Sequence, residues 1–119
     1  MRIRFVGQPF ATQQNLLDFI EFATTAGFDE LRIAVAWAKR SGLGRISDSL
    51  SAFRAQGGKV TIILGVSEGG ATREGLEIAL DVADEAFVFH DPGRTFHPKV
   101  YLASSAGPRS LIVGSSNLT

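Results

Sequence analysis

The residues best suited to chemistry lie near the end of the chain, in the stretch FHPKVYL. His97 and Lys99 stand two residues apart in this β-like run, and the period of two in a strand would place both side chains on one face. A histidine supplies a nucleophilic or basic nitrogen near neutral pH, and a lysine supplies a compact positive charge. The pair is therefore suited to an anion site.

A second set of polar groups follows the next β-like run. It is a turn of small or amide-bearing residues: Gly114, Ser115, Ser116 and Asn117. The serines supply hydroxyls, the asparagine supplies an amide, and the glycine lets a backbone approach closely. A lone histidine beside an aromatic residue such as Phe96 is most often structural. Its neighbours here favour a cradle for a tetrahedral anion.

Composition limits the kind of protein to which such a site could belong. The chain has 119 residues, 45% of them hydrophobic, which is enough for one domain with a real core. Lysine plus arginine and aspartate plus glutamate both number 12, so net charge neither supports nor excludes a nucleic-acid partner. There is no cysteine, no signal-peptide pattern, and no apolar run near the roughly 20 residues that cross a bilayer. We expect a cytoplasmic protein that does not bind a membrane.

The elements that must position these residues alternate along the chain. Strands are expected at residues 3–6, 31–37, 59–64, 86–89, 98–103 and 110–113. Helices are expected after an N-cap at Thr12, around residues 46–53, and over residues 72–81. The pattern predicts an α/β fold: a mixed β-sheet with βαβαβα order and then a C-terminal hairpin, with helices on both faces.

Ligands of such sheets gather at the carboxyl ends of the strands. The glycine-rich residues 65–72 follow one strand end, but they match no phosphate-loop motif, so a solvated turn is the favoured interpretation. Trp37 follows another strand end and could border a cleft, with Lys39 and Arg40 touching phosphates. It could equally fill the core, and packing is favoured.

The pattern formed by His97, Lys99, Gly114, Ser115 and Asn117 resembles the HKD motif of the phospholipase D superfamily. The form HPKVYL followed by GSSNLT is similar to the divergent branch found in nuclease and helicase-associated domains. The motif's aspartate would fall at Ser104 and is missing, and the stretch from there to Gly114 is longer than usual in the family. The resemblance implies that residues 1–119 form a single PLD-like half-domain.

The resemblance also implies phosphodiester chemistry without a metal or any other cofactor. His97 would be the catalytic nucleophile and form a phosphohistidine, while Lys99 and Asn117 stabilise the transition state. Ser115, Ser116 and Gly114 would bind the substrate phosphate.

Two parts of this mechanism are missing from the sequence. The family's general acid is the histidine of a second HKD motif, and His90 has no lysine two residues on, so it is interpreted as a turn residue. A homodimer or a second HKD half is the expected partner that supplies the acid. The carboxylate that orients the nucleophile commonly follows the asparagine in the family. We therefore expect an N-terminal or internal fragment of a longer protein, catalytically incomplete without residues beyond Thr119.

Three functions remain open at this point. The leading one is a nuclease domain acting on nucleic acid, with DNA favoured and with a fused helicase or DNA-recognition domain as a partner. The second is a phospholipid hydrolase or phosphatidyl transferase that uses the same histidine. The third is a degenerate phosphate-binding or dimerisation module without turnover, which the loss of the aspartate at Ser104 keeps open.

Overall fold

The computed structural model describes residues 1–3, 15–114 and 117–118 of the chain, with the side chain of Glu68 outside the described part. Several predictions made from the sequence fall outside this range and are not tested by it. They concern most of the strand at residues 3–6, and the positions Thr12, Ser115 and Ser116.

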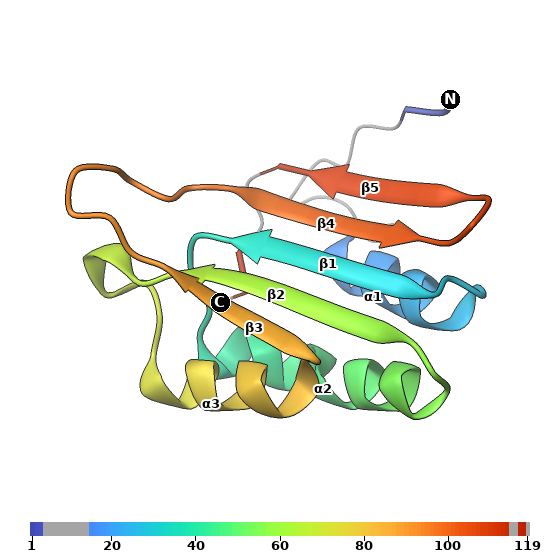
Figure 1. Ribbon diagram of the computed structural model, residues 1–119, viewed down its shortest axis with the longest axis horizontal. Coiled ribbons are helices and arrows are strands. Elements are labelled where there is room, and N and C mark those ends of the chain that lie inside the picture. The colour runs from blue at the N-terminus through green and yellow to red at the C-terminus, as the bar shows by residue number, and fades with distance from the viewer. Residues whose placement is uncertain (4–14, 115–116, 119) are drawn as a thin grey trace.

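The described elements follow the predicted order of alternating helices and strands (Figure 1). In chain order they are α1 (Leu16–Thr25), β1 (Glu30–Val35), α2 (Arg40–Ala55), β2 (Lys59–Gly65), the 3₁₀ turn η1 (Ser67–Gly69), α3 (Arg73–Val82), β3 (Glu85–Phe89), β4 (Lys99–Ser104) and β5 (Arg109–Val113). The α/β class and the closing hairpin are confirmed, with element boundaries within a few residues of the prediction except at the start of α2.

The strands form one mixed sheet in the order β3-β2-β1-β4-β5. Strands β1, β2 and β3 are parallel, β4 is antiparallel to β1, and β5 is antiparallel to β4. Val35, the last residue of β1, is opposite Lys99, the first residue of β4. The carboxyl ends of β1, β2, β3 and β5 therefore meet the start of β4 at one edge, which we call the carboxyl edge.

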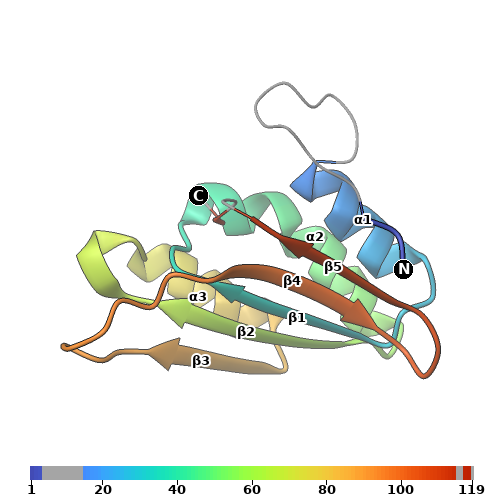
Figure 2. The same ribbon diagram turned by 90° about the horizontal axis from the view of Figure 1, so that it is seen from above.

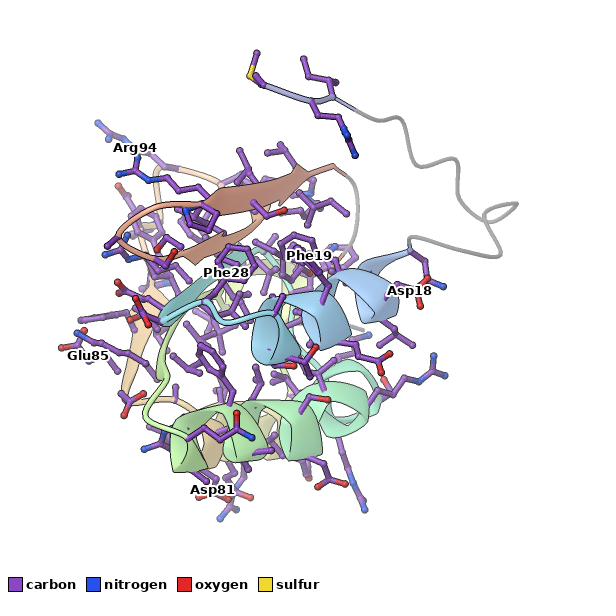
Figure 3. The ribbon with its side chains drawn as sticks, turned by 90° about the vertical axis from the view of Figure 1, so that its right-hand side faces the viewer. Asp18, Phe19, Phe28, Asp81, Glu85 and Arg94 are labelled. Carbon is purple, nitrogen blue, oxygen red and sulfur yellow. The ribbon has the colours of Figure 1, made fainter. Side chains whose placement is uncertain are left out.

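The core lies between the sheet and the helices. Alternate residues of β1, Leu31, Ile33 and Val35, are buried, as the two-residue period of a strand requires. They belong to one cluster with residues of all three helices, such as Ile20 of α1 and Leu50 of α2. Figure 2 shows the helices side by side along the sheet, and Figure 3 shows the space between filled by side chains, Phe19 and Phe28 among them.

The other face of the sheet carries Arg32, Phe87, Leu111 and Val113, all exposed. Right-handed crossovers between neighbouring parallel strands put α2 and α3 on the same side, and α1 packs against α2. The described helices thus cover one face, and the helix cover expected on the second face is not among the described residues.

Two helix starts differ from the prediction. The N-cap of α1 is Asn15 and not Thr12, because Asn15 and Asp18 form a reciprocal capping box through their side chains and backbone N–H groups. Helix α2 begins at Arg40, one turn and more before Ile46, although its N-cap residue Lys39 offers no side-chain cap. Helix α3 begins within one residue of the prediction, and its N-cap is Thr72, whose hydroxyl accepts from the Gly75 N–H.

At the edge of the sheet opposite the carboxyl edge, the Asp84 carboxylate joins two elements. Asp84 accepts a 2.7 Å hydrogen bond from the Val60 N–H, and the Arg54 Nε lies 3.3 Å from the same carboxylate oxygen. The hydrogen bond from Val60, aided by the Arg54 charge, lowers the pKa of Asp84 from its ordinary value. This carboxylate links α2 to the start of β2 in its charged form.

Candidate active site

His97 and Lys99 are in contact at the carboxyl edge. The Lys99 Nζ lies 2.8 Å from Nδ1 and 3.1 Å from Nε2 of the His97 ring, and it also donates to the His97 carbonyl oxygen at 3.2 Å. His97 itself lies just before β4, where Pro98 offers its carbonyl oxygen to the Ala36 N–H at 2.9 Å. The predicted pairing of the two side chains on one side of the chain is therefore present.

The two side chains differ in their exposure. Lys99 retains only 8% of its surface in solvent, whereas His97 is exposed. Among the described residues, no carboxylate lies within ion-pair distance of the Lys99 ammonium. A buried cation without a counter-ion is costly, because it loses hydration and gains no opposite charge in return. Within the described side chains, the site therefore places a positive charge without a carboxylate partner directly beside an accessible imidazole.

Asn117 reaches this edge through Trp37. The Trp37 N–H donates to the Asn117 Oδ1 at 3.0 Å, across a separation of 80 residues in the chain. Next to it, the Leu118 N–H donates to the Trp37 carbonyl oxygen at 3.1 Å, and the Lys39 N–H donates to the Leu118 carbonyl oxygen at 2.7 Å. Ala38 and Leu118 form an isolated parallel bridge. The segment after β5 is thus attached to the segment after β1.

The Trp37 side chain lies between His97 and the turn after β2. Its ring centroid is 6.5 Å from that of His97, with an interplanar angle of 88°, an edge-to-face arrangement. On the other side it packs on Gly70, where an added Cβ would overlap the Trp37 Cδ1. Trp37 is half-buried, so it both packs and borders the site. The two interpretations left open by the sequence are not exclusive.

The turn after β2 is not the solvated loop expected for residues 65–72. Gly70 is buried beneath the indole of Trp37, and Gly65 lies against the Ala36 carbonyl oxygen and Phe96, where a Cβ would be 2.8 Å from the oxygen. These glycines permit close packing of the loop on the strand ends. No sequence pattern signals this contact, because it joins residues from different βα units.

The remaining predicted residues occupy different places. The Gly114 N–H donates to the Lys99 carbonyl oxygen at 3.2 Å, so it is not free for an anion, although the space around its Cα is open. Ser104 ends β4 far from His97 along the strand, where its carbonyl oxygen accepts from the Asp29 N–H. His90 is exposed directly after β3, in agreement with a turn residue.

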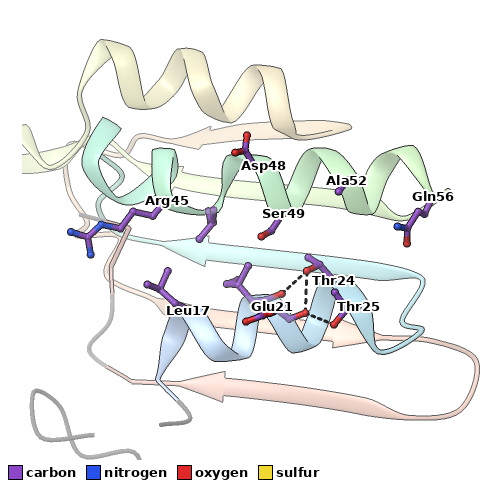
Figure 4. Close-up of a pocket in the computed structure, with 11 residues that line it drawn as sticks. Leu17, Glu21, Thr24, Thr25, Arg45, Asp48, Ser49, Ala52 and Gln56 are labelled. Atoms are coloured by element: carbon purple, nitrogen blue, oxygen red, sulfur yellow. Dashed lines mark hydrogen bonds between the residues drawn. The ribbon is translucent and has the colours of Figure 1, made fainter. Parts of the chain in front are cut away.

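A groove of about 480 Å³ between α1 and α2 lies apart from these residues (Figure 4). It is lined by residues of the two helices, and none of the predicted site residues is among them. The hydroxyls of Thr24 and Thr25 in its wall already donate to backbone carbonyl oxygens of α1. We assign no chemistry to this groove.

The described part of the chain holds no group of three or more histidine, aspartate or glutamate side chains that could bind a metal ion. None of the helices in this part is both long enough and apolar enough to span a membrane.

Comparison with known proteins gives a likeness of fold. No protein-family model and no curated protein sequence matches the chain. Among solved structures, it is similar to the crystal structure of polyphosphate kinase from Porphyromonas gingivalis, with a TM-score of 0.65 and 16% sequence identity. The match covers 94% of this chain and 20% of that chain. At this identity the match shows a likeness of fold alone, so the superfamily, the HKD assignment and the activity are proposals.

Proposed function

We propose that the chain is a PLD-like phosphodiesterase domain that needs no metal and acts on nucleic acid as a nuclease through a phosphohistidine intermediate. The observation that carries this proposal is the buried Lys99 ammonium, without a carboxylate partner among the described residues, in contact with the accessible His97 ring. A phosphodiester supplies the negative charge that this arrangement lacks, and it places phosphorus within reach of a ring nitrogen.

The reaction proceeds in two displacements. The lone pair of one His97 ring nitrogen forms a bond to phosphorus, the bond from phosphorus to the leaving oxygen breaks, and that oxygen takes a proton from a general acid. In the second step a water oxygen attacks phosphorus, gives its proton to the same acid group acting as a base, and displaces the His97 nitrogen. Both steps concentrate charge on the non-bridging oxygens, which Lys99 and Asn117 stabilise.

The general acid is proposed to come from a second HKD half, in a homodimer or a longer chain. A two-fold axis through the carboxyl edge would give each copy of His97 one of the two roles. His90 is a poor substitute because it lies after β3 and has no lysine two residues on. Ser115 and Ser116 are kept in the proposal as phosphate-binding groups, on the resemblance alone.

Nucleic acid is the preferred substrate, with DNA favoured over RNA. The HPKVYL and GSSNLT forms resemble nuclease and helicase-associated domains, and a fused helicase or DNA-recognition domain is the proposed partner that supplies specificity. The experiment must distinguish nuclease activity from two alternatives. These are hydrolysis of phosphodiesters in lipids and phosphate binding without turnover.

The experiment measures hydrolysis of bis(p-nitrophenyl) phosphate, plasmid DNA, phosphatidylcholine and inorganic polyphosphate in EDTA. It uses this chain, a version with a second HKD half, and His97→Ala of each. We expect chelator-resistant cleavage of the nitrophenyl diester and DNA that His97→Ala abolishes. Cleavage of lipid or polyphosphate in preference to DNA would overturn the nuclease assignment. A folded protein that binds phosphate but turns over no substrate in either version would overturn the enzymatic one.

A further inference from the structure

We propose that Trp37 is the positioning residue of this site: its backbone fixes Asn117, its indole sets the orientation of the His97 ring, and Gly70 is the seat that holds the indole in place. This inference deepens the proposed function and rests on it for its catalytic consequence. Its geometric content can be tested without any turnover.

The backbone of Trp37 determines how Asn117 can act. An asparagine side chain has one acceptor oxygen and one donor NH₂ group. The Trp37 N–H occupies the oxygen at 3.0 Å, so the NH₂ group is the other end of the amide, and it has no protein partner among the described residues. The carbonyl oxygen of Trp37 holds the next residue, Leu118, at 3.1 Å. Both backbone groups of Trp37 therefore hold the segment that carries Asn117, in an orientation that commits its oxygen and leaves its NH₂ group as the end proposed to bind a phosphate oxygen.

The indole has a comparable effect on the nucleophile. His97 is exposed, so burial alone does not fix its ring plane. Two described contacts do so: the Lys99 ammonium at both ring nitrogens and the edge-to-face contact with Trp37. Displacement of the indole would leave the ring held only by a flexible lysine side chain. Reactions that need in-line attack are sensitive to such small changes in position.

Gly70 provides a way to move the indole without altering Trp37, His97 or Asn117. Its φ of −72° is in the ordinary helical region, so alanine meets no backbone strain there. The added Cβ would instead overlap the Trp37 Cδ1 and push the ring aside. Gly107, in the turn between β4 and β5, is a matched control because a Cβ there has nothing within 4 Å.

The first readout is the NMR spectrum of the two histidine rings. Ring current from the indole shifts the His97 ring protons, so Gly70→Ala and Trp37→Ala should each change the His97 shifts and leave those of His90 unchanged. Gly107→Ala should change neither, and the remaining dispersed signals report that each variant is folded. If Trp37→Ala does not fold, Gly70→Ala and the conservative Trp37→Phe decide the result. Unchanged His97 shifts in folded Gly70→Ala would overturn the inference, whether or not the chain is an enzyme.

The second readout is the split between kcat and KM on the nitrophenyl diester. Gly70→Ala should lower kcat by about tenfold with KM nearly constant, because positioning affects the transition state more than binding. Trp37→Phe should restore most of the kcat lost in Trp37→Ala. In the Trp37→Ala background, Gly70→Ala should have no further effect, since the group that it displaces is absent. Additive losses would contradict the inference. If the wild-type chain is inactive but the His97 signals shift in Gly70→Ala and Trp37→Ala, only the proposed function is contradicted.

Discussion

Charged side chains at the two edges of the sheet differ in whether they have a partner of opposite charge. At the edge where β2 begins, Asp84 lies against Arg54 and Lys59 lies 3.8 Å from Glu85, so each of these charges has an opposite partner. At the carboxyl edge, Lys99 is buried to 8% exposure, and in the described residues its neighbour is a histidine ring in place of a carboxylate. Asp84 and Lys59 thus have opposite partners within the protein, whereas Lys99 has none among the described side chains, and we propose that a ligand compensates it.

We interpret the paired charges at one edge as structural and the Lys99 cation at the other edge as functional. A compensated charge strengthens the fold and contributes little to recognition, because its field is already neutralised by a neighbour. An uncompensated buried cation weakens the fold and attracts anions. Lys99 lies where the strand ends, the Trp37 ring and Asn117 converge.

The largest expected effect comes from removal of the nucleophile. His97→Ala should lower the rate of diester hydrolysis by about 10³-fold or more, because the proposed nucleophile, the histidine in contact with Lys99, is lost. His90→Ala is the matched control and should retain wild-type activity. Steady-state kinetics in EDTA check both variants. Comparable losses in the two variants would mean that contact with Lys99 does not distinguish His97 from the other histidine at this edge.

The next prediction concerns replacement of Lys99, which should lower activity and raise stability. Lys99→Met should lower kcat by about 10²-fold, because a transition-state charge loses its stabilising cation. The same variant should raise the free energy of unfolding by about 1 kcal/mol, because a buried charge is replaced by an apolar chain of similar length.

Lys59→Met is the control at the compensated edge. That lysine is about half exposed and its ion pair is long, so activity and stability should change little. Thermal denaturation and kinetics measure the pair of variants. A loss of stability in Lys99→Met would mean that the cation is compensated after all.

A smaller effect is expected from Asp84→Asn, which weakens the compensated edge. The variant should lose about 1 kcal/mol of stability at neutral pH through the hydrogen bond from Val60, with wild-type activity. The pKa of Asp84 is lowered in the folded state, so its contribution is present above the unfolded value of about 3.9 and is lost as the pH falls through the folded value. Denaturation at neutral and acid pH should therefore show the two proteins converging in acid. A constant difference across this range would exclude the charged form of Asp84 as the cause.

The smallest expected effect concerns Tyr101, which tests whether water reaches from the carboxyl edge into the core. Tyr101 is two residues after Lys99 on the same inward face and is 1% exposed, and burial raises the pKa of its phenol well above the usual range. It is the chain's only tyrosine, so phenolate absorbance reports on it alone. The absorbance should stay flat through pH 10, where an exposed tyrosine is about half ionised, and rise only on unfolding. A reversible midpoint near 10 would mean that water reaches beyond Lys99 into the core.

The sequence was sufficient for the order of elements and for the His97 and Lys99 pair, because both depend on local periods of two and 3.6 residues. Two further local signals are present in the sequence. Arg32 in the middle of β1 indicates an open sheet face, and the Asn15 and Asp18 spacing indicates the true cap of α1.

The contacts of Trp37 could not be predicted in this way. Its bonds to Asn117 and its seat on Gly70 join segments that are far apart in the chain, and only the register of the folded sheet brings them together. The sequence left Trp37 between core and cleft because periodicity places a residue on a face and does not identify its neighbours.

The most direct test is to look for the covalent intermediate. The protein carrying a second HKD half is mixed with bis(p-nitrophenyl) phosphate in EDTA, denatured at alkaline pH, where phosphohistidine persists, and digested for mass spectrometry. We predict a nitrophenyl phosphate adduct on the peptide that contains His97, absent in His97→Ala and unaffected by His90→Ala. Turnover without an adduct on His97, or with the adduct on another residue, would contradict the assignment of His97 as the nucleophile.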